Sequence, residues 1–261
     1  MKFTVITVAY NSASTIEETF QSMLWQDYKD YEYIVIDGAS EDDTLAIIQH
    51  YEPLFEGRMR WHSDKDKGIY DAMNKALSMA TGDVIGFLNS DDTYNRQDIL
   101  TTVAKHLEDQ SIDAVYADLH YVDPHTKVPV RYYSSRWFRP WALRFGLIPG
   151  HPTFYCRRKV YDQYGHFNDS YAIAADFDCI LRLIHIHKIR TKYIADNWVS
   201  MKKGGASTSG FNSYRTGMLE HRRALKENGV YSNYFMLSLR YFYKVAELAY
   251  SFWRYRVRKR P

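Results

Sequence analysis

Short apolar runs alternate with more polar stretches through the first half of this chain. The β-branched run 2–8 (KFTVITV) and the apolar run 84–88 (VIGFL) both end in polar clusters, which is typical of buried parallel strands. The intervening stretches predict helices, and Ser14-x-x-Glu17 is a capping-box signature for the first. We expect strands at residues 2–8, 31–36, 59–62, 84–88 and 114–117, and helices from about residue 14 and at 42–50, 69–80 and 97–108. This alternation predicts an α/β fold with a Rossmann-like, mostly parallel sheet flanked by helices.

The pattern loosens after about residue 119. Helices are expected at 158–164 and 176–186, a strand near 191–195, and a long helix from about Asn233. Residues 131–149 are rich in Tyr, Trp, Phe and Arg, which predicts a mobile or surface-docking loop.

Composition narrows the function classes. The chain has 261 residues, and its 34 basic and 31 acidic side chains leave a net charge of +3, which argues against a dedicated nucleic-acid binder. Cys156 and Cys179 form no CxxC pattern, so a reducing cytoplasm is the expected compartment. No charge-free run of 18 apolar residues and no signal peptide are found, so we expect neither a membrane span nor secretion.

Polar clusters follow two of the expected strands. Asn89-Ser90-Asp91-Asp92 follows the run 84–88, and Asp37 ends the run 31–36. Ligands of open α/β sheets bind at the carboxyl ends of strands, and adjacent carboxylates suit a hard divalent cation that bridges to phosphates. The same residue types also favour turns and helix caps, so these residues alone leave both interpretations open. No GxGxxG follows the first strand, which argues against an ordinary dinucleotide site.

Six segments, in order, carry a family resemblance. They are VITVAYN (5–11), YIVIDGASEDDT (33–44), SDKDKGIYDAMNKAL (63–77), GDVIGFLNSDD (82–92), AADFDCILRL (174–183) and GGAS (204–207). Together they resemble the inverting, nucleotide-sugar-dependent glycosyltransferases of family 2, which have the GT-A fold. The sequence is most similar in character to bacterial exopolysaccharide and lipopolysaccharide enzymes, such as those of colanic acid assembly.

The resemblance implies a donor site and a metal site. The donor-binding positions fall on Thr7, Ala9, Tyr10, Asp37, Asp66, Gly68, Asn74, Asn89 and Ser90. The family's Asp-x-Asp metal motif aligns with Asn89-Ser90-Asp91, so Asp91, supported by Asp92, is the expected ligand of Mn²⁺ or Mg²⁺. Asn89 replaces the first Asp of the motif, and the lost charge is expected to weaken metal affinity.

The family's catalytic base aligns with Asp176, at the start of an expected helix. Inversion requires an acceptor hydroxyl to attack opposite the leaving diphosphate, and a nearby carboxylate takes its proton. Asp178 is the rival, but side chains two apart on a helix point in different directions, and Asp176 is alternatively a helix cap. His151 is a weaker candidate for contact with acceptor or phosphate. Gly204, Gly205 and Ser207 are expected to form either a phosphate-facing lid or a flexible surface loop.

The C-terminal helix has a polar stripe and an apolar, aromatic remainder. The stripe consists of Arg240, Lys244, Glu247, Ser251, Arg254 and Arg258. Such a helix with a basic end fits in-plane binding at an anionic bilayer. The alternative is a helix packed on the catalytic core or in a homodimer.

The sequence thus predicts a GT-A domain at 1–210, with a nucleotide-sugar-binding half (1–118) and an acceptor-binding half (119–210), and a helical appendage at 211–261. The expected reaction moves a sugar from a UDP-sugar to a saccharide acceptor, expected to be lipid-linked, on the inner face of the cytoplasmic membrane. Asn89 favours one alternative, a catalytically silent sugar-nucleotide-binding or membrane-scaffold subunit. A nucleotidyltransferase would need a Gly-rich basic loop after the first strand, which AYNSAST lacks.

Overall fold

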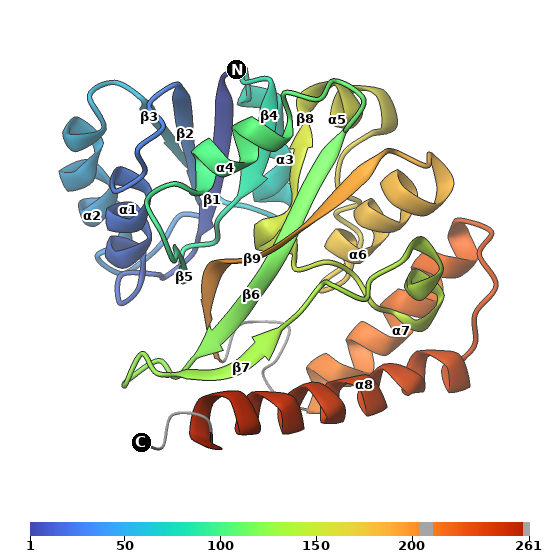
Figure 1. Ribbon diagram of the computed structural model, residues 1–261. Helices are drawn as coiled ribbons and strands as arrows, with labels where there is room; N and C mark the ends of the chain where they lie inside the picture. Colours follow the sequence, from blue (N-terminus) through green and yellow to red (C-terminus); the bar gives the residue numbers. More distant parts are fainter. Residues whose placement is uncertain (204–210, 258–261) are drawn as a thin grey trace.

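Helices cover both faces of one twisted sheet in the computed structural model, which describes residues 1–203 and 211–257 (Figure 1). The strands are β1 (Phe3–Ala9), β2 (Tyr31–Asp37), β3 (Met59–Ser63), β4 (Val84–Phe87), β5 (Asp92–Tyr94), β6 (Ala114–Val122), β7 (Pro129–Tyr133), β8 (Tyr155–Arg157) and β9 (Thr191–Lys202). The α-helices are α1 (Ile16–Leu24), α2 (Thr44–Tyr51), α3 (Ile69–Met79), α4 (Ile99–His106), α5 (Arg158–Tyr164), α6 (Ala175–Ile180), α7 (Phe211–Glu227) and α8 (Tyr234–Phe252). Shorter helical segments are η1 (Glu52–Phe55), η2 (Pro140–Phe145), η3 (His151–Thr153), η4 (Leu181–Ile186) and η5 (Trp253–Val257).

The strand order reverses direction at β1. Hydrogen-bonded neighbours run β3-β2-β1-β4-β8-β6-β9-β5, with β7 paired to β6. Strands β3, β2, β1 and β4 are mutually parallel, whereas β8 is antiparallel to β4. The chain thus moves outward from β1 through β2 to β3, then returns to the other side of β1 as β4. Such a reversal leaves a crevice at the carboxyl ends of the strands.

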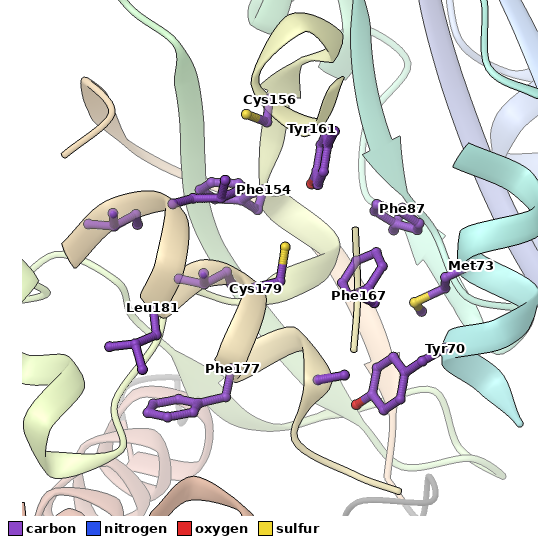
Figure 2. Close-up of a cluster of buried hydrophobic side chains, with 14 of the residues drawn as sticks. Tyr70, Met73, Phe87, Phe154, Cys156, Tyr161, Phe167, Phe177, Cys179 and Leu181 are labelled. Atoms are coloured by element: carbon purple, nitrogen blue, oxygen red, sulfur yellow. The ribbon is translucent and has the colours of Figure 1, made fainter. Parts of the chain in front are cut away.

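Both faces of β1, β2 and β4 are buried, and successive side chains of each strand point to opposite faces. Ile6 and Val8 of β1 point into a core that also contains side chains of α3, α5 and α6. Phe3 and Val5 point into the opposite core, beside α1, α2 and α4. Figure 2 shows part of the first core, where Phe167 lies among side chains from α3, β4 and α6. The α6 helix is therefore fixed against the sheet by apolar packing.

The expected α/β class and mostly parallel sheet are confirmed, with three local differences. The Ser14–Glu17 capping box does not form, since the N-cap of α1 is Thr15 and has no side-chain capping bond. The strand expected near 191–195 extends to Lys202, because its second half pairs with both β6 and β5. The segment 131–149 begins in β7 and contains η2 rather than being loop throughout.

The predicted halves 1–118 and 119–210 share one sheet, since β8 and β9 of the second half pair with β4 and β6. The division into regions 1–118, 119–210 and 211–261 therefore stays a prediction. The last helix, α8, packs on β7 and η2. Among the described residues, no helix is both long and apolar enough to cross a bilayer.

Two glycines give opposite expectations for substitution by alanine. A Cβ added to Gly86 in β4 would lie 2.2 Å from the ring of Tyr155, which is fully buried. Gly86→Ala should lower the free energy of unfolding by about 1–3 kcal/mol through overpacking. Gly217 in α7 is the control, because its added Cβ would meet only Ile173, at 3.9 Å. Gly217→Ala should raise that free energy by about 0.5–1 kcal/mol through helix propensity. Urea denaturation measures both, and equal effects would contradict the packing of β4 on β8.

Candidate active site

A cleft of about 930 Å³ lies where the carboxyl ends of β1 and β4 meet α3 and α6. It brings together candidate residues that are far apart in the sequence. The candidates that line it are Ala9, Tyr10, Asp66, Gly68, Asn89, Ser90, Asp91, His151 and Asp176. The clustering follows from topology, because parallel strands present their carboxyl ends at one edge of the sheet.

Asp91 and Asp92 form an electrostatically costly pair at the end of β4. Asp91 lines the cleft, and burial raises the pKa of its carboxyl. Asp92 is fully buried, and burial, together with the charge of Asp91, raises its pKa well above the usual range. One oxygen of Asp92 accepts a hydrogen bond from the Asn89 amide (3.1 Å), and its other oxygen has no partner. The pair therefore favours a proton or a cation nearby.

The donor set fits a divalent cation held mainly by substrate. No group of three or more His, Cys, Asp or Glu side chains within 1–203 and 211–257 could hold a metal ion alone. Asp91 offers a carboxylate to the cleft, and the unpaired oxygen of Asp92 adds negative potential behind it. Mg²⁺ and Mn²⁺ commonly use one or two carboxylates and complete their coordination with phosphate and water. The residues present fit such an ion.

Asp176 lies at the first turn of α6, where it lines the cleft. Its Oδ1 accepts hydrogen bonds from the Phe177 backbone N–H (2.7 Å) and from the Tyr70 hydroxyl (3.4 Å). Burial outweighs these hydrogen bonds and raises the pKa of Asp176 to about 6. A carboxyl poised near neutral pH and open to a cleft is suited to accept a proton.

The rival carboxylate, Asp178, faces away from the cleft. Its side chain is buried and pairs with Arg182 at 2.9 Å, one helical turn later. The Asn228 amide donates a second hydrogen bond to it, also at 2.9 Å. These contacts join α6 to η4 and to the end of α7, which is a structural role.

Glu220 of α7 anchors the loop that precedes Asp176. Its two carboxylate oxygens accept hydrogen bonds from three consecutive backbone N–H groups, those of Ala172 (2.8 Å), Ile173 (2.9 Å) and Ala174 (3.0 Å). The single proton of the Tyr70 hydroxyl is shared between the carbonyl oxygen of Ile173 and Oδ1 of Asp176, and it reaches them from the α3 side. The segment that leads to Asp176 is thus held by groups from two helices.

His151 is a neutral polar group in the cleft wall. It stacks on Phe87, with ring centroids 5.1 Å apart, and its Nε2 has no hydrogen-bond partner. Burial lowers its pKa to about 4, so the ring is uncharged at neutral pH. An uncharged imidazole offers one hydrogen bond to a ligand without adding charge.

At the other end of the cleft, Asp66 pairs with Lys75 of α3 and lies close to Gly38. A Cβ at Gly38 would be 3.0 Å from the Asp66 carboxylate and 3.5 Å from the Tyr10 ring. The nearby Asp37 is fully buried and accepts hydrogen bonds from Ser40 and Ser63. Asp37 thus shapes the turn after β2 in this structure, and Gly38 lines the cleft in its place.

Two other donor candidates do not line the cleft. Thr7 is fully buried, where its hydroxyl bonds to the Tyr33 hydroxyl (2.7 Å) and to the carbonyl oxygen of Leu88 (2.5 Å). The Asn74 amide exchanges two hydrogen bonds with the backbone of Phe167 and so fixes that loop. Gly204, Gly205 and Ser207 lie outside the described residues.

The sequence is also similar to a known protein family. The sequence model described as Glycosyl transferase family 2 matches residues 4–172, which is more than half of the chain. This chain belongs to glycosyl transferase family 2. The family resemblance of the six segments is thereby confirmed.

Similar proteins carry glycosyltransferase names. A PGL/p-HBAD biosynthesis glycosyltransferase of Mycobacterium bovis is 31% identical over 196 residues, covering 74% of this chain and 73% of that protein. Chondroitin synthase of Escherichia coli is 31% identical over 69% of this chain and only 27% of its own length.

Solved structures show the same fold. S. aureus TarS 1–349 in complex with UDP-GlcNAc has a TM-score of 0.68 at 22% identity and covers 86% of this chain and 66% of that one. The mannosyltransferase PcManGT from Pyrobaculum calidifontis, in complex with GDP-Man and Mn²⁺, has a TM-score of 0.63 at 21% identity, covering 85% of this chain and 64% of that one.

Three residues of this family 2 glycosyltransferase were not among the predicted site residues, namely Tyr70, Lys75 and Glu220. Tyr70 and Lys75 belong to the GIYDAMNK segment, where their spacing after Gly68 places them on the first turns of α3. Glu220 follows the last of the six segments, and nothing in its neighbourhood marks it. Only the packing of α7 beside α6 brings it to the loop before Asp176.

Glu220→Gln tests how much the anchoring of this loop matters. The amide group of Gln would place a donor against backbone N–H donors, so Asp176 should lose its fixed position. We expect glycosyl transfer to fall about tenfold or more, because small misplacements of a reacting group are costly. Glu108→Gln is the control, since Glu108 is exposed and lies after α4, away from this loop. Initial-rate kinetics measure glycosyl transfer by both variants, and circular dichroism checks that both are folded. Equal losses would assign Glu220 no special role.

Proposed function

We propose that this protein is an inverting glycosyltransferase that moves a sugar from a nucleotide-diphosphate donor, expected to be a UDP-sugar, to a saccharide acceptor. The observation that carries the proposal is that Asp91 and Asp176 line one cleft at the reversal of strand order. One carboxylate belongs to the β4 end, where the diphosphate is expected, and the other to α6, on the acceptor side. Inversion needs this division of roles across the sugar.

The roles of the chain's own residues follow from their surroundings. Asp176 accepts the proton of the attacking hydroxyl at a carboxylate oxygen, while its Oδ1 is held by the Phe177 N–H and Tyr70. Phe177, the next residue, and Phe167 are buried in the apolar core beside this helix (Figure 2). Proton transfer to a positioned base of this kind contributes roughly 10²–10⁴-fold in rate.

Asp91 would hold a divalent cation, Mn²⁺ or Mg²⁺, with Asp92 adding negative charge behind it. When bound, the ion would neutralise negative charge that develops on the leaving diphosphate. The raised pKa values of both carboxyls support this assignment, because a cation relieves the repulsion between them.

The donor's nucleoside end is assigned to the region of Ala9, Tyr10, Gly38 and Asp66. Tyr10 is exposed at the cleft and can stack on a base or sugar. TarS, which has the same fold, was crystallised with UDP-GlcNAc, and PcManGT with GDP-Man. A hexose or N-acetylhexosamine is therefore the expected class of transferred sugar.

The acceptor is proposed to be a saccharide linked to lipid, used in bacterial surface polysaccharide assembly on the cytoplasmic face of the membrane. The similarity to a PGL/p-HBAD biosynthesis glycosyltransferase supports a biosynthetic role. The silent-subunit alternative predicts donor binding without transfer, so detection of transfer product would discard it.

Asp176→Asn should remove most turnover and leave donor affinity unchanged, because the amide keeps the shape and cannot take a proton. The loss should be roughly 10²–10⁴-fold. In the wild type, kcat/KM should rise with pH through about 6, the pKa of Asp176, since a protonated carboxyl is no base. That acidic limb should vanish in the variant.

Asp178→Asn is the matched control for this experiment. It should lower the free energy of unfolding, since it breaks the buried pair with Arg182, and it should change the pH profile little. Product analysis by NMR should show an anomeric configuration opposite to that of the donor. A retained anomer, or a loss under about tenfold for Asp176→Asn, would assign the base elsewhere.

Asp91→Asn should abolish the increase in melting temperature that UDP produces in the presence of Mn²⁺, without altering the ligand-free fold. The carboxylate is the proposed protein ligand of the ion, and an amide is a much weaker one. Asp43→Asn, an exposed aspartate before α2, is the control and should keep the shift. A full Mn²⁺-dependent shift in Asp91→Asn would rule out the metal assignment.

A further inference from the structure

The polarity of α8 is inverted relative to an ordinary surface helix. Its polar residues face the protein, where Arg240, Glu247 and Ser251 are buried, with Glu247 only 8% exposed. Arg131 of β7 makes an ion pair with Glu247 at 2.5 Å. The hydroxyl of Ser251 accepts a hydrogen bond from the backbone N–H of Tyr132 at 2.8 Å. These contacts attach α8 to the sheet by its polar side.

The opposite side of α8 is apolar and faces outward. Its exposed residues include Phe235, Phe242, Val245 and Leu248. Their spacing of seven, three and three places them on one face of the helix. Phe235 is 72% exposed and Phe242 74% exposed, so the face has no cover in the described part of this chain. A contiguous exposed apolar surface of this kind marks an interaction site.

Charge favours a lipid surface as the occupant. Between residues 234 and 261 the only acidic side chain is Glu247, and it is buried against Arg131. The same segment ends in five basic residues, Arg254, Arg256, Arg258, Lys259 and Arg260. A second copy of this chain would meet this surface with the same apolar face and basic end, and no carboxylate of α8 would be free to pair with the cations. Anionic lipid headgroups supply the missing negative charge, and aromatic side chains suit the headgroup boundary.

We propose that the outward face of α8 docks on an anionic membrane surface, with the helix lying in the plane of the interface. Nearby η2 packs on α8, and its region exposes Trp137 and Trp141 as further interfacial anchors. Because β7 pairs with β6 of the same sheet that carries the cleft, docking fixes the orientation of the whole enzyme. The inference rests on the proposed function only for its purpose, which is to bring the cleft to a lipid-linked acceptor.

The test compares two double variants of the full chain. Phe242→Ser with Leu248→Ser removes two side chains from the outward face of α8. Trp25→Ser with Leu54→Ser is the control, since both residues are similarly exposed but lie at α1 and η1. Sedimentation with phosphatidylcholine vesicles, with and without phosphatidylglycerol, measures binding at 0.1 M and 0.5 M NaCl. The melting temperature with UDP and Mn²⁺ shows that the cleft is intact.

The wild type and the control should bind the anionic vesicles, and 0.5 M NaCl should weaken that binding without abolishing it, because salt screens only the basic contribution. The α8 variant should bind at least about tenfold more weakly, since it loses two apolar side chains that would enter the bilayer interface. Equal binding by the two variants, or no binding by the wild type, would overturn the proposal. So would a wild-type dimer that the α8 variant converts to monomer in light scattering, since the face would then belong to a second copy. Loss of the UDP response in every protein would refute the proposed function and leave the vesicle result standing.

Discussion

The parallel pairing of β1 with β2 on one side and β4 on the other is the constraint on which the site depends. Seven backbone positions of β1 are in register with β2, from Phe3 to Ala9, and four are in register with β4. Because both neighbours run in the same direction as β1, the polar segments after all three strands emerge at one edge. The two apolar cores hold this arrangement, since each face of β1 packs against a different set of helices. A shift in register by one residue would exchange the two faces and displace the cleft.

The electrostatics of the cleft follow from burial rather than from ion pairing. Asp91, Asp92 and Asp176 all have raised pKa values, and burial is the main cause in each case. Their surroundings nevertheless differ in a way that separates their roles. Asp92 carries an unpaired buried oxygen beside a second carboxyl, which calls for a positive charge. A backbone N–H and a tyrosine hydroxyl fix the direction of the Asp176 carboxyl, and its pKa is about 6. Asp178, which pairs with Arg182, lies outside the cleft and joins helices, whereas Asp66 lines the cleft and pairs with Lys75.

The C-terminal helix reverses the usual relation between burial and polarity. Hydrophobic burial normally directs the apolar face of a helix inward. In α8 three of the four buried residues are polar, and one buried ion pair and a hydroxyl bond secure the helix to β7. Breaking such a pair would leave a buried charge without a partner. The ion pair therefore fixes the position of α8 along β7. The apolar face is consequently held outward as part of a folded domain, instead of being free to turn toward the core.

The sequence by itself determined the class of fold and the family. Apolar runs that end in polar clusters mark β1, β2 and β4, since a strand buried on both faces requires such a run. The six segments identified the family, and nine of the candidate residues line the cleft. The three-residue strands β5 and β8 were missed, because pairing with distant strands, and not local composition, creates them.

Tertiary structure alone decided which polar residues are open to a ligand. Asp37, Thr7 and Asn74 carry suitable groups, yet each is satisfied by a neighbouring hydroxyl or backbone group. Glu220 carries no local signal, and only helix packing brings it to the loop before Asp176. The sequence showed the polar stripe of α8, but it did not show whether that stripe faces the protein or the surroundings. The periodicity of a helix defines two faces, and only the partner that it packs against determines which one is turned inward.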